Sequence, residues 1–353
     1  RIGLGCLSAA VGLGGLAPAL GLDRLATRLG LGGEAGLLGL AARLGGSHTL
    51  EKFINEVGRD IPDPQVKMSV WERARAQAIV EGSPAQRSDA MSRDDLRIYA
   101  LGSGSDYTPF LQHLGIASLN IGFGGEDGGG SYHSIYDSYD HYTRFGDPGF
   151  AYGIALSKVC GHAVLRLASA ETLPFEFTNF ADTVGLYVNE VTKLTDTMRE
   201  ETKLMNQAIS SGILKAVQDP KETFVVPKPK AVVPYLDFSP LQNALAKLKD
   251  SAGAYKRASG GKQPSAATQK SLDEILYKTE RALTRTEGLP RRDWFRHQIY
   301  APGFYTGYGV KTLPGVREAI EQRDWKEADE QMLVISKVID QFAAEIDKAA
   351  KLY

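Results

Sequence analysis

Cysteine is scarce in this chain of 353 residues, which contains two, Cys6 and Cys160. They are too few for a disulfide framework, and neither belongs to the closely spaced cysteine pair that is typical of a zinc site. An excess of charge of one sign is absent too, because 41 basic and 42 acidic side chains leave a formal net charge of -1. Such a chain has no long-range field for a polyanion, so we expect no nucleic acid among its principal partners.

Residues 1–46 consist mostly of Gly, Leu and Ala, a composition that specifies a packed structure poorly. One interpretation is a secretory signal or membrane anchor, because residues 2–22 carry no charge, Arg1 precedes them, and Ala-Pro-Ala at 17–19 is similar to a cleavage site. The other is a truncated, misread or rearranged end, since glycines and a proline interrupt the apolar run. We expect no chemistry in these residues.

From residue 47 the pattern is that of an α/β protein. Apolar residues in 50–57 have helical spacing, with Ser47 or Thr49 as a cap. Residues 62–95 predict a loop-rich connection with one amphipathic turn. Short strands are predicted at 96–101 and 116–123.

A glycine-rich turn and a helix-like stretch, residues 102–114, separate the two predicted strands. Strand, turn, helix and strand form a βαβ unit, whose loops at the carboxyl ends of the strands are the expected place for a site.

From about Asp182 the apolar residues repeat at helical spacing, which predicts a C-terminal bundle. Helices are expected to begin at Asp182, at Ser239 and at Ser265, the third of them ending at Gly288. A final helix is predicted from Asp324, whose side chain is an N-cap. It should bury one stripe, made of Trp325, Ala328, Met332, Ile335, Ile339, Phe342 and Ile346. No membrane-spanning segment is predicted after residue 46.

The densest cluster of chemically active side chains lies at residues 131–141, which contain two histidines, two aspartates and three tyrosines. A local metal site could be built from His133, Asp137, Asp140 and His141. A polar surface loop is the favoured interpretation, because the cluster has no HxxxH or HExxH spacing and a catalytic zinc takes about three protein ligands.

Two glycine-rich loops are further candidates. Residues 102–106 could bind an anion through backbone N–H groups, but they lack a P-loop lysine and a GxSxG elbow, so a tight turn is the favoured interpretation. The aromatic segment 300–309 is of the kind that reaches a neighbouring domain and lines a pocket, or simply packs. The other histidines are expected to be cap, surface or core residues: His48, His113, His162 and His297.

Several segments, taken in order, carry a family resemblance: residues 101–107 (LGSGSDY), 113–118 (HLGIAS), 132–139 (YHSIYDSY), 145–148 (FGDP), 173–175 (LPF), 288–290 (GLP) and 296–302 (RHQIYAP). The chain resembles the C-terminal portion of the glutamate carboxypeptidase II group of the M28 zinc peptidases, which includes prostate-specific membrane antigen and the transferrin receptors. This implies a partial M28 α/β sandwich at residues 47–181 and an all-α, transferrin-receptor-like dimerisation bundle at 182–353, preceded by the segment 1–46.

The resemblance also implies roles for individual residues. His133 matches the last zinc ligand of the family, and Tyr132 matches a tyrosine that contacts the substrate and stabilises the tetrahedral intermediate. Tyr308 matches a tyrosine that binds the substrate's terminal carboxylate, and Gly104 and Ser105 match substrate contacts. In the complete family site two zinc ions share a bridging hydroxide and a glutamate is the general base.

Departures from the family pattern limit these expectations. The other zinc ligands and the paired glutamates belong to a segment upstream of the match, which this chain does not contain, so we expect it to be inactive alone. Gly307 stands where glutamate-selective members have a lysine, and Asn120 and Gly122 replace an arginine patch. A strong preference for acidic substrates therefore loses its electrostatic basis, although Lys311 is near.

Two functional hypotheses follow. The first is the C-terminal portion of a zinc-dependent exopeptidase that hydrolyses C-terminal residues of peptides. The alternative is a non-catalytic, transferrin-receptor-like dimerisation module. Both predict a homodimer, and the first predicts a peptide substrate and an extracytoplasmic location.

Overall fold

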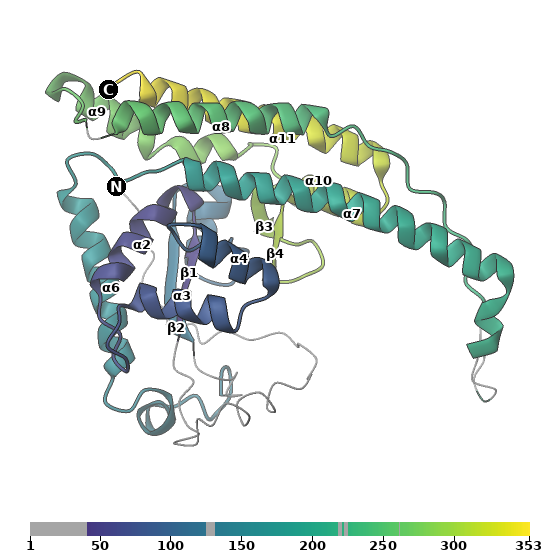
Figure 1. Ribbon diagram of the computed structural model, residues 1–353, viewed down its shortest axis with the longest axis horizontal. Helices are drawn as coiled ribbons and strands as arrows, with labels where there is room; N and C mark the ends of the chain where they lie inside the picture. The colour runs from purple at the N-terminus through teal and green to yellow at the C-terminus, as the bar shows by residue number, and fades with distance from the viewer. Residues whose placement is uncertain (1–40, 125–130, 218–220, 222–224, 261) are drawn as a thin grey trace.

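The computed structural model describes residues 41–124, 131–217, 221, 225–260 and 262–353. Residues 1–40 lie outside this part of the chain, so the predictions made for them, including those for Cys6, have no structural counterpart here. The described chain is mostly helical with two small sheets of two strands each (Figure 1). None of its described helices is long and apolar enough to cross a lipid bilayer.

The first sheet includes residues for which composition predicted no structure. Strand β1 (Ala41–Gly46) pairs antiparallel with β2 (Leu119–Gly124), and Gly45 forms a single parallel bridge to Tyr99. β1 therefore lies between the predicted strands, and residues 96–101 are extended chain with one bridge rather than a full strand. Because β2 runs opposite to both, the predicted parallel βαβ unit is wrong.

Glycine explains how β1 approaches its neighbour. A Cβ atom at Gly45 would lie 2.4 Å from the ring of Tyr99. Without that atom the aromatic ring lies directly against the strand.

Helices cover this sheet. The chain continues through a 3-10 turn, η2 (His48–Leu50), into α2 (Glu51–Asp60), α3 (Val70–Val80) and α4 (Pro84–Ser92). The predicted helix at 50–57 is confirmed as η2 and α2, but neither predicted cap is used, since η2 has no side-chain cap and Leu50 stands before α2.

After β2 the chain forms α5 (Tyr139–His141), the π-helical turn η4 (Tyr142–Gly146) and the long helix α6 (Ala151–Ser169). A first core is shared by α2, α3 and α6 beneath the sheet, and contains Phe53, Ile54, Val57, Ile61, Val70, Ile98, Val159 and Ala163.

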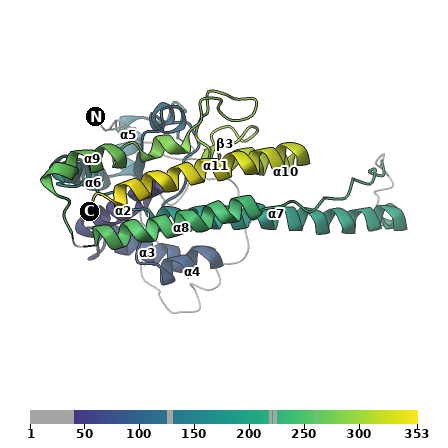
Figure 2. The same cartoon turned by 90° about the horizontal axis from the view of Figure 1, so that it is seen from above.

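The rest of the chain is the predicted bundle, with helices α7 (Thr178–Ser211), α8 (Ser239–Ser259), α9 (Ala266–Leu276), α10 (Pro314–Glu321) and α11 (Trp325–Ala350). Helices α8 and α11 lie side by side along their length (Figure 2). The side chain of Asp324 accepts a hydrogen bond from the backbone N–H of Glu327, which confirms the predicted cap. The helix predicted at 265–287 is shorter, because it stops at Leu276 and a 3-10 turn, η6 (Thr279–Leu283), follows.

A second, larger core joins the two parts. Leu50, Leu101 and Leu111 from the first part pack in one cluster with the bundle residues Phe177 and Phe342. A small hairpin, β3 (Tyr300–Pro302) and β4 (Val310–Thr312), leaves the bundle beside this junction (Figure 1). Its connecting loop is the aromatic segment that the sequence singled out.

Candidate functional site

The structure brings two of the predicted site segments into contact, the loop at 102–106 and the loop of the β3–β4 hairpin. The backbone N–H of Ser103 donates to the carbonyl oxygen of Tyr308 at 3.1 Å. A Cβ atom at Gly102 would lie 2.1 Å from that oxygen, and one at Gly104 would lie 2.9 Å from Cγ of the Tyr308 ring. Both glycines are therefore needed for the close approach, and Gly104 also has a left-handed φ of +103°. The aromatic segment, for which reaching a neighbouring domain and simple packing were both considered, thus lies against the loop at 102–106.

Buried side chains hold the first loop in shape. Tyr107 donates its hydroxyl hydrogen to the carbonyl oxygen of Ser103 at 3.0 Å, and burial raises the pKa of Tyr107 to about 12. The side-chain amide of the fully buried Gln112 donates to the carbonyls of Leu101 and Gly102 at 2.9 and 3.0 Å. The loop is therefore a rigid surface on which Tyr308 rests.

An ion pair fixes the hairpin from the other side. The Glu318 carboxylate accepts from the backbone N–H of Phe304 at 2.7 Å and from the Arg292 guanidinium at 2.6 Å. Arg292 also donates to the carbonyl oxygen of Pro302. Burial lowers the pKa of Arg292, and the Glu318 charge opposes that shift. The hairpin is thus anchored at its base while the Tyr308 ring, 71% exposed, faces solvent over Gly104.

The cations around the hairpin are engaged with carboxylates. Lys311 binds Glu321 at 2.7 Å, Arg291 binds Glu327 at 3.0 Å, and Arg292 binds Glu318. Lys311, which lies near the position of the missing lysine in the sequence but at the wrong spacing to replace it directly, is therefore paired with its own neighbour.

Tyr132 and His133 occupy a separate turn on the surface. Their rings stack with centroids 3.7 Å apart, Tyr132 is half-buried and His133 is exposed with a left-handed φ of +59°. Ser105 lies partly buried in the first loop. The structure thus joins Gly104 to Tyr308, and within the described part of the chain no hydrogen bond or ring contact joins either of them to Tyr132 or His133.

The local metal site considered from the sequence is not assembled. Asp140 pairs with Arg144 at 2.9 Å, and the His141 ring packs on Phe145. Within the described ranges no group of three or more His, Cys, Asp or Glu side chains is placed to hold a metal ion. His133, the one zinc ligand that the resemblance assigns, belongs to no such group of three or more among these residues, so they do not by themselves fit a dinuclear zinc centre.

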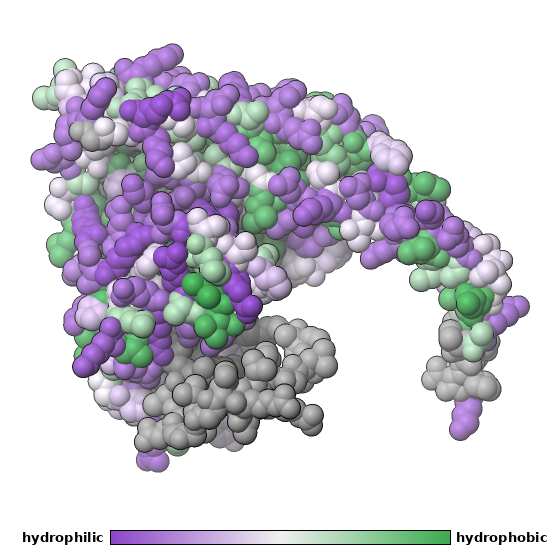
Figure 3. Space-filling model, viewed as in Figure 1, coloured by the Kyte–Doolittle hydropathy of each residue, from purple (hydrophilic) through white to green (hydrophobic). Residues whose placement is uncertain are grey.

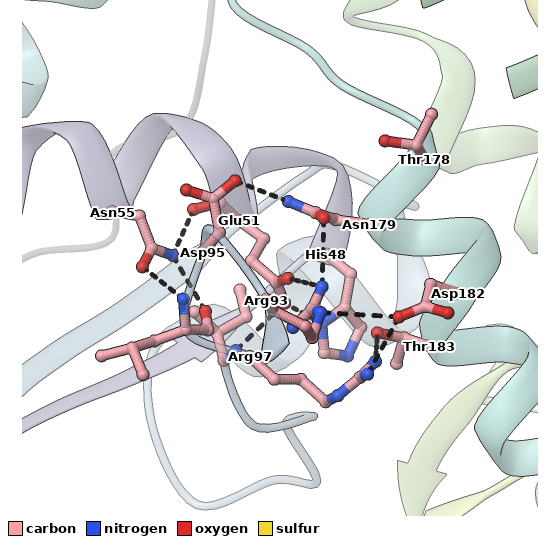
Figure 4. Close-up of polar contacts among 12 residues, drawn as sticks. His48, Glu51, Asn55, Arg93, Asp95, Arg97, Thr178, Asn179, Asp182 and Thr183 are labelled. Atoms are coloured by element: carbon pink, nitrogen blue, oxygen red, sulfur yellow. Dashed lines mark hydrogen bonds and ion pairs between the residues drawn. The ribbon is translucent and has the colours of Figure 1, made fainter. Parts of the chain in front are cut away.

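A polar cluster that joins α2, residues 93–98 and α7 was not found from the sequence (Figure 4). The wholly buried Glu51 carboxylate accepts from Arg93 at 2.6 Å, from the backbone N–H of Ile98 at 3.0 Å and from His48 Nδ1 at 3.3 Å. Arg97 reaches Asp182 on α7 at 3.0 Å. These contacts fix the segment that leads into Gly102 between α2 and α7.

Arg97 illustrates the electrostatics of this cluster. Burial alone would lower its pKa, but hydrogen bonds to Asp89 and Asp182 outweigh that effect and the pKa is raised. The cluster is therefore a fixed arrangement of charges that supports the loop. His48 and Glu51 are three positions apart, but the contacts that join Glu51 to Arg93 and Arg93 to Asn179 span 42 and 86 positions, so local spacing could not have revealed the whole cluster.

A second buried couple lies on the bundle side. The Glu280 carboxylate accepts from the hydroxyl of Tyr300 at 2.8 Å and pairs with His297 Nε2 at 3.1 Å, and all three side chains are fully buried. His48 Nε2 meets the Tyr187 hydroxyl at 2.9 Å. Of the histidines expected to be cap, surface or core residues, His48 and His297 are buried, and His113 stacks on Trp294.

Comparison with known proteins identifies the class to which the helical part belongs. Residues 236–347 match the family described as "Transferrin receptor-like dimerisation domain". This range runs from just before α8 to near the end of α11, and it includes the hairpin that carries Tyr308.

Individual relatives extend the similarity over more of the chain. A probable glutamate carboxypeptidase, LAMP1, of Arabidopsis thaliana is 31% identical over 256 residues, which are 70% of this chain and 32% of that protein. A probable glutamate carboxypeptidase of Arthroderma benhamiae is 34% identical over 227 residues, or 63% of this chain and 26% of its own. Aminopeptidase NAALADL1 of Mus musculus is 23% identical over 269 residues, or 71% and 31%.

The chain belongs to the group that contains the glutamate carboxypeptidases and the transferrin receptor-like proteins, as its motifs predicted. It spans about a third or less of the length of these relatives.

Proposed function

We propose that this chain is the C-terminal portion of a zinc-dependent M28 exopeptidase, and that it supplies the part of the site that receives the C-terminal end of a peptide. The packing of the Tyr308 ring over Gly104 carries this proposal. It places a solvent-facing phenol beside a loop of backbone N–H groups, and together these donors suit a carboxylate. Ser105 adds a hydroxyl on the same loop.

We infer further that the isolated chain does not hydrolyse peptides. Tyr132 is the candidate catalytic residue and His133 the candidate zinc ligand, but among the described residues His133 belongs to no group of three or more possible metal ligands. A dinuclear zinc centre takes several protein ligands, so hydrolysis requires residues beyond those described.

The proposed substrate is a peptide whose C-terminal residue is not strongly selected for negative charge. A free cation next to the terminal residue would be needed to favour glutamate. Lys311 forms an ion pair with Glu321, and Gly307 has no side chain, so neither residue supplies such a cation.

A binding experiment tests the proposed carboxylate-binding site at Tyr308 and Gly104. Saturation-transfer NMR should detect a short peptide with a free C-terminus on the purified chain and give a weaker response for the same peptide amidated. Tyr308→Phe should reduce the difference, whereas Tyr305→Phe, on the exposed neighbouring tyrosine, is the matched control. Equal responses for the free-acid and the amidated peptide would contradict the proposed carboxylate-binding site. Cleavage of a peptide by the zinc-loaded chain would contradict the proposed inactivity.

The second candidate is a non-catalytic dimerisation module, and the family match over residues 236–347 favours it. Both candidates include a homodimer formed through the bundle. Neither candidate predicts a zinc centre built by the described residues alone, so they differ in the peptide response: a pure module should show no difference between the free-acid and the amidated peptide. Sedimentation at micromolar concentration should give a dimer, and a monomer would count against both.

An extracytoplasmic location also belongs to the proposal, and cell fractionation tests it.

A further inference from the structure

One part of the molecule stands away from both cores. Thr202 is the last buried residue of α7, yet the helix continues to Ser211. Beyond it, the chain returns along residues 225–235 toward α8. Residues 203–213 and 225–235, hereafter the arm, project past the ends of α8 and α11 (Figures 1 and 2).

Specific contacts hold the two segments of the arm together. Asn206 exchanges two hydrogen bonds with the backbone of Lys230, at 2.8 and 3.0 Å. The Arg199 guanidinium lies 4.0 Å from the centre of the Tyr235 ring and donates to the carbonyl of Pro234 at 2.8 Å. Arg323, from the end of α10, donates to the carbonyl of Ala231 at 3.1 Å. The outgoing helix and the returning chain are thus fastened together and to the bundle.

The arm exposes many apolar side chains on this narrow support. They are Leu204 (55% exposed), Met205 (50%), Ile213 (61%), Val225 (80%), Val226 (37%), Val232 (77%) and Tyr235 (87%). In the space-filling view, apolar surface is visible along the arm (Figure 3). An isolated helix of a few turns is marginally stable in water, and a concentration of exposed apolar residues on such an element indicates that another surface covers it.

We propose that the arm is a clasp that grips the second copy of this chain in the homodimer. The returning limb ends at Tyr235, and the segment matched to the dimerisation family begins at residue 236. The arm also continues α7, which packs against α8 within that segment. The arm therefore adjoins the segment matched to the dimerisation domain, both along the chain and through the packing of α7 on α8, and this favours a second copy as the occupant.

This inference rests on the dimer in the proposed function, and it assigns to residues outside the family match a share of the dimer interface. Removing apolar contacts at the arm should weaken dimerisation without harming the fold, because Leu204 and Met205 lie beyond the last buried position of α7.

The test is the dimer dissociation constant, measured by sedimentation velocity over a concentration series. Leu204→Glu combined with Met205→Glu should raise it about tenfold or more, as expected for loss of a central apolar contact. Val232→Glu on the returning limb should act in the same direction. The matched control is Leu165→Glu, since Leu165 is 68% exposed on α6, away from the arm, and should leave the constant unchanged. Circular dichroism establishes that each variant is folded.

The possible outcomes distinguish failure of the proposed role of the arm from failure of the proposed dimer. If the wild-type chain is a monomer, the dimer and the clasp both fail. If it is a dimer whose dissociation constant the arm variants leave unchanged, the clasp alone is wrong. Binding of the wild-type chain, but not of the arm variants, to phosphatidylserine vesicles with an unchanged constant would assign the surface to a membrane instead. A photo-reactive residue placed at Ile213 should crosslink two chains.

Discussion

Gly104 meets two constraints at one position. Its φ of +103° is a conformation that L-residues rarely adopt, and the Tyr308 ring leaves no room for a Cβ atom. We expect Gly104→Ala to lower the free energy of unfolding by about 1–3 kcal/mol, through backbone strain and displacement of the ring. Urea denaturation measures this directly.

The matched control for this substitution is Gly161→Ala. Gly161 lies within α6, where a Cβ atom would meet nothing within 4 Å, so alanine should be neutral or stabilising by up to about 1 kcal/mol. Tyr308→Ala in the Gly104→Ala background should recover part of the loss. A Gly104→Ala protein as stable as the wild type would show that the two loops are not packed as described.

Individual residues of the site were predictable to different degrees. Tyr308 and Gly104 were assigned from motifs, and the structure adds that they touch. Glu318 and Arg292 hold the hairpin, but they are 26 positions apart and belong to no motif. A long-range ion pair of this kind leaves no local trace, so sequence reasoning missed it.

Secondary-structure elements were predicted well where apolar residues repeat over several turns. The stripe from Ala328 to Ile346 on α11 is buried as expected, although Trp325 is only partly buried. Helix α4 was missed because Ala90 is its one buried residue and it has no apolar face. Its capping box, Ser83 with Gln86, was the available clue.

The cap of α11 gives a prediction at this scale. Asp324→Ala removes the acceptor for the Glu327 N–H and should cost about 1 kcal/mol of stability. Thermal unfolding monitored by circular dichroism is the measurement, with Asp329→Ala on an exposed position of the same helix as the control. If both variants unfold at the same temperature, the cap contributes nothing measurable.

The whole molecule was the hardest scale to predict. Strand direction depends on partners distant in sequence, and β1 lies in a Gly- and Leu-rich stretch with no alternation to mark a strand. The single core that joins Leu101 to Phe342 likewise reflects tertiary packing. The sequence indicated an α/β part and a helical bundle, but not that the two parts share one hydrophobic core.

Glu280, which is fully buried on the bundle side, predicts a pH dependence of the stability of the molecule. Burial alone would raise its pKa, but hydrogen bonds from His297 and Tyr300 outweigh burial and lower it below the ordinary value of 4.5. The unfolded chain therefore takes up this proton more readily than the folded one. The stabilisation is complete above about pH 4.5 and is lost as the pH falls through the folded-state pKa.

Glu280→Gln tests this dependence. The variant should be less stable than the wild type near neutral pH by about 1–3 kcal/mol, and the gap should narrow below pH 4.5. Denaturant titrations at several pH values provide the comparison, and Glu274→Gln, at an exposed position on α9, is the control. A gap that stays constant with pH would refute the assignment.

Helix α7 has a mechanical consequence. It is one unbroken helix of 34 residues, so it is about 51 Å long, with Asp182 of the polar cluster in its second turn and the arm at its far end. The helix contacts α2, α8 and α10, and because it is a single rod, a tilt of about 5° would displace one end relative to the other by about 4 Å. The geometry of the loop beneath Tyr308 and the reach of the arm are therefore set by the same rigid element.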